Sequence, residues 1–384
     1  MRLPILFVIL LSQLFLISCG PSEIKLSTFI TTLGKDTLAI EQFTMQPERI
    51  DAEVLIRSPR TTYQKQTLEM DETGAFQSFH SVSYDPKDPE GGKALEETTI
   101  TVEGDSMIVT RSREGEEQVN KLAYNPGILP WQDMVHWPYE VATRHMVEAG
   151  KTSSDQLMLA GRSPAVFEIR TIEGDSVSIK HPYRGTMYAR LDEYGAIQYY
   201  DATATTRKLI VQRSEPVDMT AVAKLYAEQP IGSLSGEGET KTTVHGASIV
   251  LTYGQPAKRG RDLFGGIVPW NERWRTGANR ATHFSTDKDL IVNGLEVPAG
   301  EYTLFTIPTP AGGTLIINKQ TGQNGQQYDE SQDLGRVPMT IRQQDESVEL
   351  FTIDAVEQGD KGALQLKWGN MIFEIPFEVK GEAS

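Results

Sequence analysis

Apolar and polar residues alternate with a period of two from about Leu26 to Arg213, and turn residues interrupt the alternation at short intervals. Successive side chains of a β-strand point to opposite faces, so this period predicts strands that bury one face. Glycine, aspartate and proline between the runs predict tight turns, and short connections favour antiparallel neighbours. We therefore expect residues 26–215 to form an N-terminal domain built on a curved antiparallel meander sheet.

One stretch of this domain departs from the strand pattern. Residues 131–146, which begin at Trp131 and end at Met146, are aromatic and tolerate a helix, and Pro138 starts or breaks one. We expect a short helical insert here that covers one face or mouth of the sheet.

Residues 216–239 predict a connection between two domains. Residues 219–228 are typical of a short helix that Pro230 ends, and Ser233–Glu239 is polar and rich in serine and glycine, which predicts a flexible linker. Beyond it, residues 240–380 contain about seven strand-like runs, which favours a C-terminal antiparallel β-sandwich. Within this second domain, Trp368–Met371 has the composition of a tight hairpin turn.

The first residues have the form of a bacterial lipoprotein signal peptide. Arg2 precedes an apolar run that ends at Ser18, and Leu16–Cys19 matches the lipobox that directs acylation of a cysteine. We expect residues 1–18 to be removed, Cys19 to carry acyl chains such as palmitate, and residues 19–25 to form a tether. Stable anchoring needs more than one acyl chain. A transmembrane helix or a plain secretory signal are the alternatives, but the run is short for a span.

This assignment predicts an extracytoplasmic protein that is held at the cell envelope by its lipid. Gly20 and Pro21 include no acidic residue, so we expect the outer membrane, facing the periplasm, in a cell with two membranes. Cys19 is the only cysteine of the chain, so no disulfide is expected in the mature protein.

Charge excludes one class of partner. The chain of 384 residues has 37 Lys and Arg against 52 Asp and Glu, a formal net charge of −15. Nucleic-acid binding relies on clustered basic residues, so we expect no nucleic-acid partner. The same balance argues against a polybasic grip on anionic lipid, which leaves the N-terminal lipid as the expected membrane contact.

Six phrases of the second domain occur together and in order: Gly254–Arg261, Phe264–Trp270, Trp274–Asn279, Ala281-Thr282, Val297–Pro308 and Asn318-Lys319. The set resembles the bacterial family called domain of unknown function 2911, over about residues 240–380. The resemblance implies a secreted all-β module and no known activity. Arg280 departs from the family pattern, in which an acidic residue is common. If this position contacts a ligand, the resemblance implies a ligand preference that differs from that of such members. The N-terminal domain carries no comparable set of phrases.

The most promising candidate site is the turn-rich segment that contains Trp270, Trp274, Arg275, Asn279 and His283. Indole rings offer stacking faces for sugars or flat ligands, and a guanidinium binds carboxylate or phosphate through two parallel hydrogen bonds. Asn279 and His283 add directional hydrogen bonds. The alternative is architectural: the tryptophans pack in the core, Arg275 pairs with a carboxylate, and Gly277 and Asn279 close the turn.

No catalytic or metal-binding pattern is found. The six histidines (His80, His136, His145, His181, His245 and His283) lack the spacing of a helical zinc pair, and the nucleophile-elbow and phosphate-loop patterns are absent. We expect no cofactor and no metal. The preferred hypothesis is a non-catalytic binding module for a glycan, a lipid or a protein partner. A hydrolase of envelope polymers and a structural subunit of an envelope complex are the alternatives.

Overall fold

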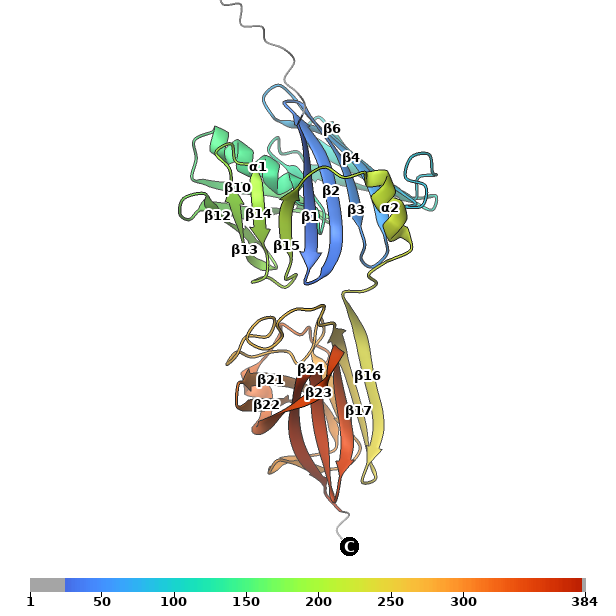
Figure 1. The fold of residues 1–384 in the computed structure, drawn as a ribbon, viewed down its shortest axis with the longest axis vertical. Coiled ribbons are helices and arrows are strands. Elements are labelled where there is room, and N and C mark those ends of the chain that lie inside the picture. The colour runs from blue at the N-terminus through green and yellow to red at the C-terminus, as the bar shows by residue number, and fades with distance from the viewer. Residues whose placement is uncertain (1–24, 382–384) are drawn as a thin grey trace, which may run out of the picture.

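The computed structural model describes residues 25–381, which form two large β-sheets and two α-helices. Cys19 and the predicted signal peptide lie outside the described residues. All strand pairs are antiparallel except that of β9 with β10, so the predicted class, mostly β with two antiparallel domains, is confirmed. The two sheets follow one another along the long axis of the molecule (Figure 1). No helix within residues 25–381 has both the length and the apolar character needed to cross a membrane.

The N-terminal sheet has fifteen strands and consists of two meanders. Neighbours in the sheet follow one another in the chain, except where β1 pairs with β15 and joins the two meanders. The strands are β1 Leu26–Leu33, β2 Asp36–Gln46, β3 Arg49–Ile56, β4 Thr62–Met70, β5 Phe76–Tyr84, β6 Glu96–Glu103, β7 Ser106–Arg113, β8 Glu116–Ala123, β9 Leu129–Trp131, β10 Ser153–Ala160, β11 Ser163–Thr171, β12 Ser176–His181, β13 Gly185–Leu191, β14 Ile197–Asp201 and β15 Ile210–Ser214.

The C-terminal sheet has nine strands, in the order β16-β17-β18-β21-β22-β23-β24-β19-β20. It folds over itself, because the second half of β23 returns beside β16, where Thr240 Oγ1 donates to the Ile353 carbonyl over 2.6 Å. One apolar core fills the space between its faces. The strands are β16 Ser235–Val244, β17 Ala247–Pro256, β18 Thr282–Thr286, β19 Leu290–Val292, β20 Leu295–Val297, β21 Gly300–Thr309, β22 Gly312–Asn318, β23 Asp333–Gln358 and β24 Lys361–Val379; η1 (Glu330–Gln332) precedes β23.

The expected hairpin turn at Trp368–Met371 is not present. Strand β24 continues through these residues, and Gly369 has a φ of +59° where the register with β23 shifts. A glycine with positive φ inside a strand marks a bulge as readily as a turn, and here it forms a bulge.

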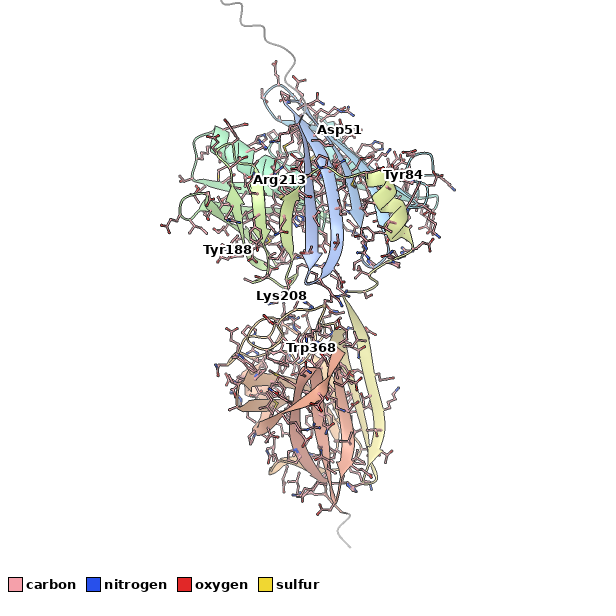
Figure 2. All side chains as sticks on the ribbon, in the orientation of Figure 1. Asp51, Tyr84, Tyr188, Lys208, Arg213 and Trp368 are labelled. Atoms are coloured by element: carbon pink, nitrogen blue, oxygen red, sulfur yellow. The ribbon has the colours of Figure 1, made fainter. Side chains whose placement is uncertain are left out.

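The two domains contact each other at the β1–β2 turn. The Lys35 backbone N–H donates to the Arg259 carbonyl over 3.0 Å, and Arg259 Nη1 lies 2.5 Å from Asp36 Oδ2. A Cβ on Gly34 would lie 2.1 Å from the same carbonyl oxygen, so glycine is needed for this approach. Figure 2 labels Lys208 and Trp368 at the facing ends of the N-terminal and C-terminal domains.

The helical insert is α1 (Trp137–Glu148), which covers one face of the N-terminal sheet. Glu41 of β2 caps its start, because the Glu41 carboxylate accepts from the backbone N–H of His136 and Trp137 at 2.8 and 2.9 Å. A carboxylate satisfies the free N–H groups of a helix N-terminus and complements its dipole. Helix α2 (Met219–Ala227) packs on the opposite sheet face, over Ile40 and Leu55.

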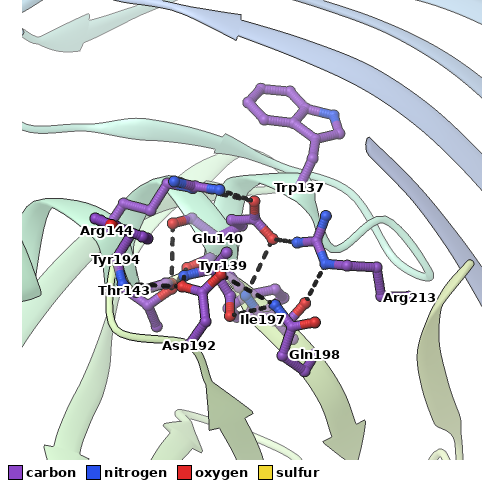
Figure 3. A network of polar contacts seen from close by, with 12 residues as sticks. Trp137, Tyr139, Glu140, Thr143, Arg144, Asp192, Tyr194, Ile197, Gln198 and Arg213 are labelled. Carbon is purple, nitrogen blue, oxygen red and sulfur yellow. Dashed lines mark hydrogen bonds and ion pairs between the residues drawn. The ribbon is translucent and has the colours of Figure 1, made fainter. Parts of the chain in front are cut away.

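Glu140 of α1 ties the helix to the sheet through a buried network (Figure 3). Its side chain is fully buried and accepts from Arg144 over 3.0 Å, from Arg213 of β15, and from the Ile197 N–H over 3.1 Å. Burial raises the pKa of the Glu140 carboxyl, and the two guanidinium groups oppose that shift. Both oxygens of this buried carboxylate therefore have partners within the chain.

The segment between the domains differs from the flexible linker expected at Ser233–Glu239. Strand β16 begins at Ser235, and residues 229–232 lie against the end of β3. Arg57 Nη2 donates to the Gln229 carbonyl over 2.7 Å, and Ser58 Oγ donates to the Gly232 carbonyl over 2.9 Å. Composition predicted flexibility at Ser233–Glu239, but Ser235–Glu239 pairs with β17, and Arg57 and Ser58 bind the backbone of the residues just before this segment.

Candidate ligand-binding cleft between the two domains

A cleft of about 1160 Å³ lies between the two domains. The N-terminal domain contributes the ends of β1 and β3, the loop after β9, and the connection between β14 and β15. The C-terminal domain contributes the long segment between β17 and β18 and part of β24. Lys208 and Trp368 stand on the two sides (Figure 2).

The lining of this cleft has the opposite charge to the whole chain. Seven of its side chains are basic and two are acidic, an excess of five positive charges in a protein of net charge −15. The basic residues are Arg60, Arg184, Arg207, Lys208, Arg261, Arg275 and Arg280, and the acidic residues are Asp133 and Glu272.

Some of these cations have partners within the chain. Arg184 and Arg207 both form ion pairs with the carboxylate of Asp133. Arg261 donates to the Ala257 and Lys258 carbonyls at 2.7 and 3.1 Å, and burial together with nearby Arg259 lowers its pKa to about 10. These three guanidinium groups are held in fixed positions at the rim and walls of the cleft.

Lys208 and Arg275 form no ion pair with a carboxylate within residues 25–381. Arg60 and Arg280 also form none there, but their side chains are exposed, whereas Lys208 and Arg275 are partly buried. Arg275 Nη1 makes one long contact, 3.4 Å to the Asn279 carbonyl, and its stem packs on Gly325, where a Cβ would lie 2.6 Å from Arg275 Cδ. Burial lowers the pKa of both groups; Arg261 and Arg275 lower that of Lys208 further, and the carboxylate of Glu272 opposes this shift. The cleft thus concentrates partly desolvated positive charge.

Three of the five residues predicted from the sequence line this cleft: Trp274, Arg275 and Asn279. Trp274 stacks on Trp368 with ring centroids 6.1 Å apart and planes 9° apart, and its Nε1 donates to the Gly277 carbonyl over 3.1 Å. The indole is therefore part of the aromatic core as well as of the cleft wall.

Trp270 and His283 are not among the lining residues. Trp270 stacks on Phe264 at a centroid distance of 5.7 Å. His283 Nε2 accepts from the Gly322 N–H over 2.8 Å, so its Nδ1 is the donor toward the Ala281 carbonyl at 2.9 Å. Both ring nitrogens of His283 hold the neighbouring loop in place.

The loop that carries Arg275 has an unusual backbone. Thr276 is fully buried with a φ of +56°, a conformation that is strained for a β-branched residue, and Asn279 has a φ of +61°. Gly277 faces Gly254 of β17, and a Cβ on Gly254 would lie 1.7 Å from the Ala278 carbonyl oxygen. Strain of this kind is concentrated at functional sites in proteins, and here it presents Arg275 and Asn279 to the cleft.

Residues 235–377 match the family DUF2911, a protein of unknown function. The resemblance predicted for the last third of the chain is confirmed, and the Trp274–Asn279 loop lies inside the DUF2911 domain. The N-terminal region has no family match. No curated protein matches the chain.

Two solved structures are distantly similar. A β-barrel-like protein of the DUF1849 family from Brucella abortus is 10% identical, with 50% of this chain and 95% of that chain covered and a TM-score of 0.32. A DUF1089 family protein from Pseudomonas aeruginosa is 11% identical, with coverages of 43% and 90% and a TM-score of 0.28. At these TM-scores neither likeness establishes a shared fold.

The sequence did not point to the N-terminal half of the cleft. Four residues on this side of the cleft are distant in sequence from the loop Trp274–Asn279, and most are distant from one another: Asp133, Arg184, Arg207 and Lys208. No local motif marks them, because they lie opposite Arg275 only through the packing of the two domains, which includes the contact of the β1–β2 turn with Arg259. Within residues 25–381 no three His, Cys, Asp or Glu side chains gather as a metal site.

Proposed function

We propose that this protein is a lipid-anchored, extracytoplasmic binding protein that holds a small ligand in the cleft between its two domains. The observation that supports this is the cleft itself, which both domains line and which is large enough for a ligand of metabolite size. Clefts between domains are a preferred location for ligand sites. The two walls of the cleft that we expect to contact the ligand are the loop Trp274–Asn279 and the connection between β14 and β15.

The proposed anchor places the cleft on the side away from the membrane. Residues 20–25 separate Cys19 from Leu26, a span of at most about 25 Å. Strand β1 then runs from Leu26 to Leu33, and Leu33 lines the cleft. An acylated Cys19 would hold the Leu26 end near the bilayer, and the cleft would face the aqueous compartment.

The binding function is tested by filling the cleft. Ala204 is exposed and lines it, so Ala204→Trp should block a ligand without disturbing a core. The matched control is Ala123→Trp, which adds the same bulk at an exposed position of β8 outside the cleft. The measurement is the melting temperature of the mature lipoprotein in neutral detergent, with and without aqueous and chloroform–methanol extracts of bacterial envelopes.

A ligand that binds only the native state raises the melting temperature. We expect an extract to stabilise the wild type and Ala123→Trp but not Ala204→Trp. The proposal is contradicted if no extract stabilises the wild type, or if Ala204→Trp responds as strongly as the control.

The anchor is tested separately. Cells that express the wild type or Cys19→Ala are labelled with a radioactive fatty acid, and Ser12→Ala serves as a control inside the signal peptide. We expect label on the wild type and on Ser12→Ala and none on Cys19→Ala, since the thiol is the acyl acceptor. Equal labelling of all three would exclude Cys19 as the anchor.

A further inference from the structure

We propose, on the basis of the binding function above, that the ligand carries a phosphate-type oxyanion, which Lys208 of the N-terminal domain and Arg275 of the DUF2911 domain bind together. The proposal names the chemical class of the ligand and makes both domains necessary for holding it. Three observations support it.

The first observation is the reversal of charge. The chain is strongly acidic, yet the cleft between its domains has a surplus of five positive charges. A basic cleft with low-dielectric walls raises the local concentration of anions and excludes cations. Such a surplus suits a group with more than one negative charge, such as a phosphomonoester or a diphosphate, better than a single carboxylate.

The second observation is the lack of internal partners for two of these cations. Among the described residues no carboxylate pairs with Lys208 or Arg275, although both are partly withdrawn from water. Withdrawing an unpaired charge from water is unfavourable, and the polar groups of a native fold normally have partners. A bound oxyanion would supply the missing partner to both side chains.

The third observation is how Arg275 is presented. Its stem is fixed against Gly325, and the next residue, Thr276, is strained and fully buried, so the guanidinium is directed by the backbone and not by a carboxylate. A planar guanidinium binds a phosphate through two parallel N–H···O bonds, and a lysine acts as a point charge. Arg275 would orient the oxyanion, and Lys208 would neutralise it from the opposite wall.

Two sources fit this chemistry: a soluble phosphorylated compound and a phospholipid headgroup. The experiment therefore uses two probes, inorganic pyrophosphate and dihexanoyl phosphatidic acid, with dihexanoyl phosphatidylcholine as the zwitterionic control. Affinity is measured by isothermal titration calorimetry on the mature lipoprotein in neutral detergent. The variants are Lys208→Met, Arg275→Met and Arg275→Lys, and the control is Lys151→Met, which removes an exposed lysine outside the cleft.

We expect wild type and Lys151→Met to bind one of the anionic probes alike, and Lys208→Met and Arg275→Met each to weaken it at least tenfold. Arg275→Lys should weaken it several-fold, because it keeps the charge and loses the paired geometry. The probe with the higher affinity identifies the source. The result also depends on salt, since the attraction is between charges.

The oxyanion proposal is overturned if neither anionic probe binds, or if the cleft variants bind as well as Lys151→Met. An extract that still stabilises the wild type and not Ala204→Trp would then leave the binding function standing with a different ligand class. If, in addition, no extract stabilises the wild type, both the oxyanion proposal and the binding function are contradicted.

Discussion

Two groups of basic side chains in this molecule differ in whether the chain itself supplies their counter-charge. In the N-terminal domain, Arg144 and Arg213 converge on the buried carboxylate of Glu140, whose oxygens also accept a backbone N–H (Figure 3). In the cleft, Lys208 and Arg275 stand on opposite walls without a carboxylate partner among the described residues.

This difference separates a structural role from a binding role. The Glu140 network joins α1 to β14 and β15, and removal of one member leaves a buried charge unpaired. Lys208 and Arg275 connect no structural elements through an ion pair among the described residues, so we expect their charges to contribute little to the stability of the fold. Positive charge that is buried and paired stabilises the protein, whereas positive charge that is partly buried and unpaired is available to a ligand.

The largest expected effect concerns the buried network in which Arg144 and Arg213 pair with Glu140. Glu140→Gln removes the charge that both arginines share and puts an amide donor next to guanidinium donors. We expect the unfolding free energy of the N-terminal domain to fall by about 3–5 kcal/mol, and the melting temperature to fall by roughly 10 °C. Circular dichroism during thermal unfolding measures this.

The matched control for that change is Glu168→Gln. Glu168 pairs with Lys180 at 2.7 Å on the surface, with both side chains well exposed, so the loss should be less than about 1 kcal/mol. Equal losses for the two variants would show that burial does not distinguish the Glu140 network.

A second prediction concerns His181, which lies near the two arginines that pair with Asp133. Its Nδ1 accepts from the Tyr183 N–H over 3.1 Å, and burial, with Arg184 next, lowers its pKa to about 4. The unfolded chain, with a pKa near 6.5, therefore binds more protons between about pH 6.5 and 4. Stability that is present above this range is lost as the pH falls through it.

We expect the unfolding free energy of the wild type to drop by about 2 kcal/mol more than that of His181→Asn between pH 7 and pH 5. Asparagine keeps an acceptor for Tyr183 N–H and does not titrate. Urea titrations at the two pH values measure the difference, and parallel losses in both proteins would mean that His181 is accessible to protons in the folded state.

The smallest expected effect on stability concerns Lys208, one of the two unpaired cations of the cleft. Lys208→Met keeps the stem and removes a charge whose pKa burial and two nearby arginines lower. Without ligand, we expect the unfolding free energy to stay equal or rise by up to about 1 kcal/mol, because repulsion within the cleft is relieved. A clear loss of stability in urea titration would place Lys208 with the paired, structural cations.

Much of the fold could be predicted because the signals are local. Alternation predicted the strands of both sheets, and the Trp131–Met146 stretch predicted α1, since side-chain periodicity depends only on neighbours in sequence. The prediction of a turn at Trp368–Met371 was wrong, because a glycine with positive φ occurs in bulges as well as in hairpin turns. The linker Ser233–Glu239 was expected to be flexible because composition does not reveal that its residues from Ser235 onward pair with β17.

Only the C-terminal wall of the cleft could be predicted from the sequence. Trp274, Arg275 and Asn279 are close in sequence, so their crowding is visible without a structure. Lys208 carries no such signal, and its place opposite Arg275 depends on the contact between two domains. Long-range charge convergence cannot be recognised from local patterns in a single chain.

The central claim, that the unpaired cations serve a ligand and not the fold, is tested most directly by one pair of melting curves. The wild type and Lys208→Met/Arg275→Met are melted side by side, without an anion and with the phosphate probe that the wild type binds. We predict a crossover, in which the variant melts at or above the wild type without the anion and below it with the anion. A variant that melts lower without the anion and gains as much from the anion as the wild type would contradict the account.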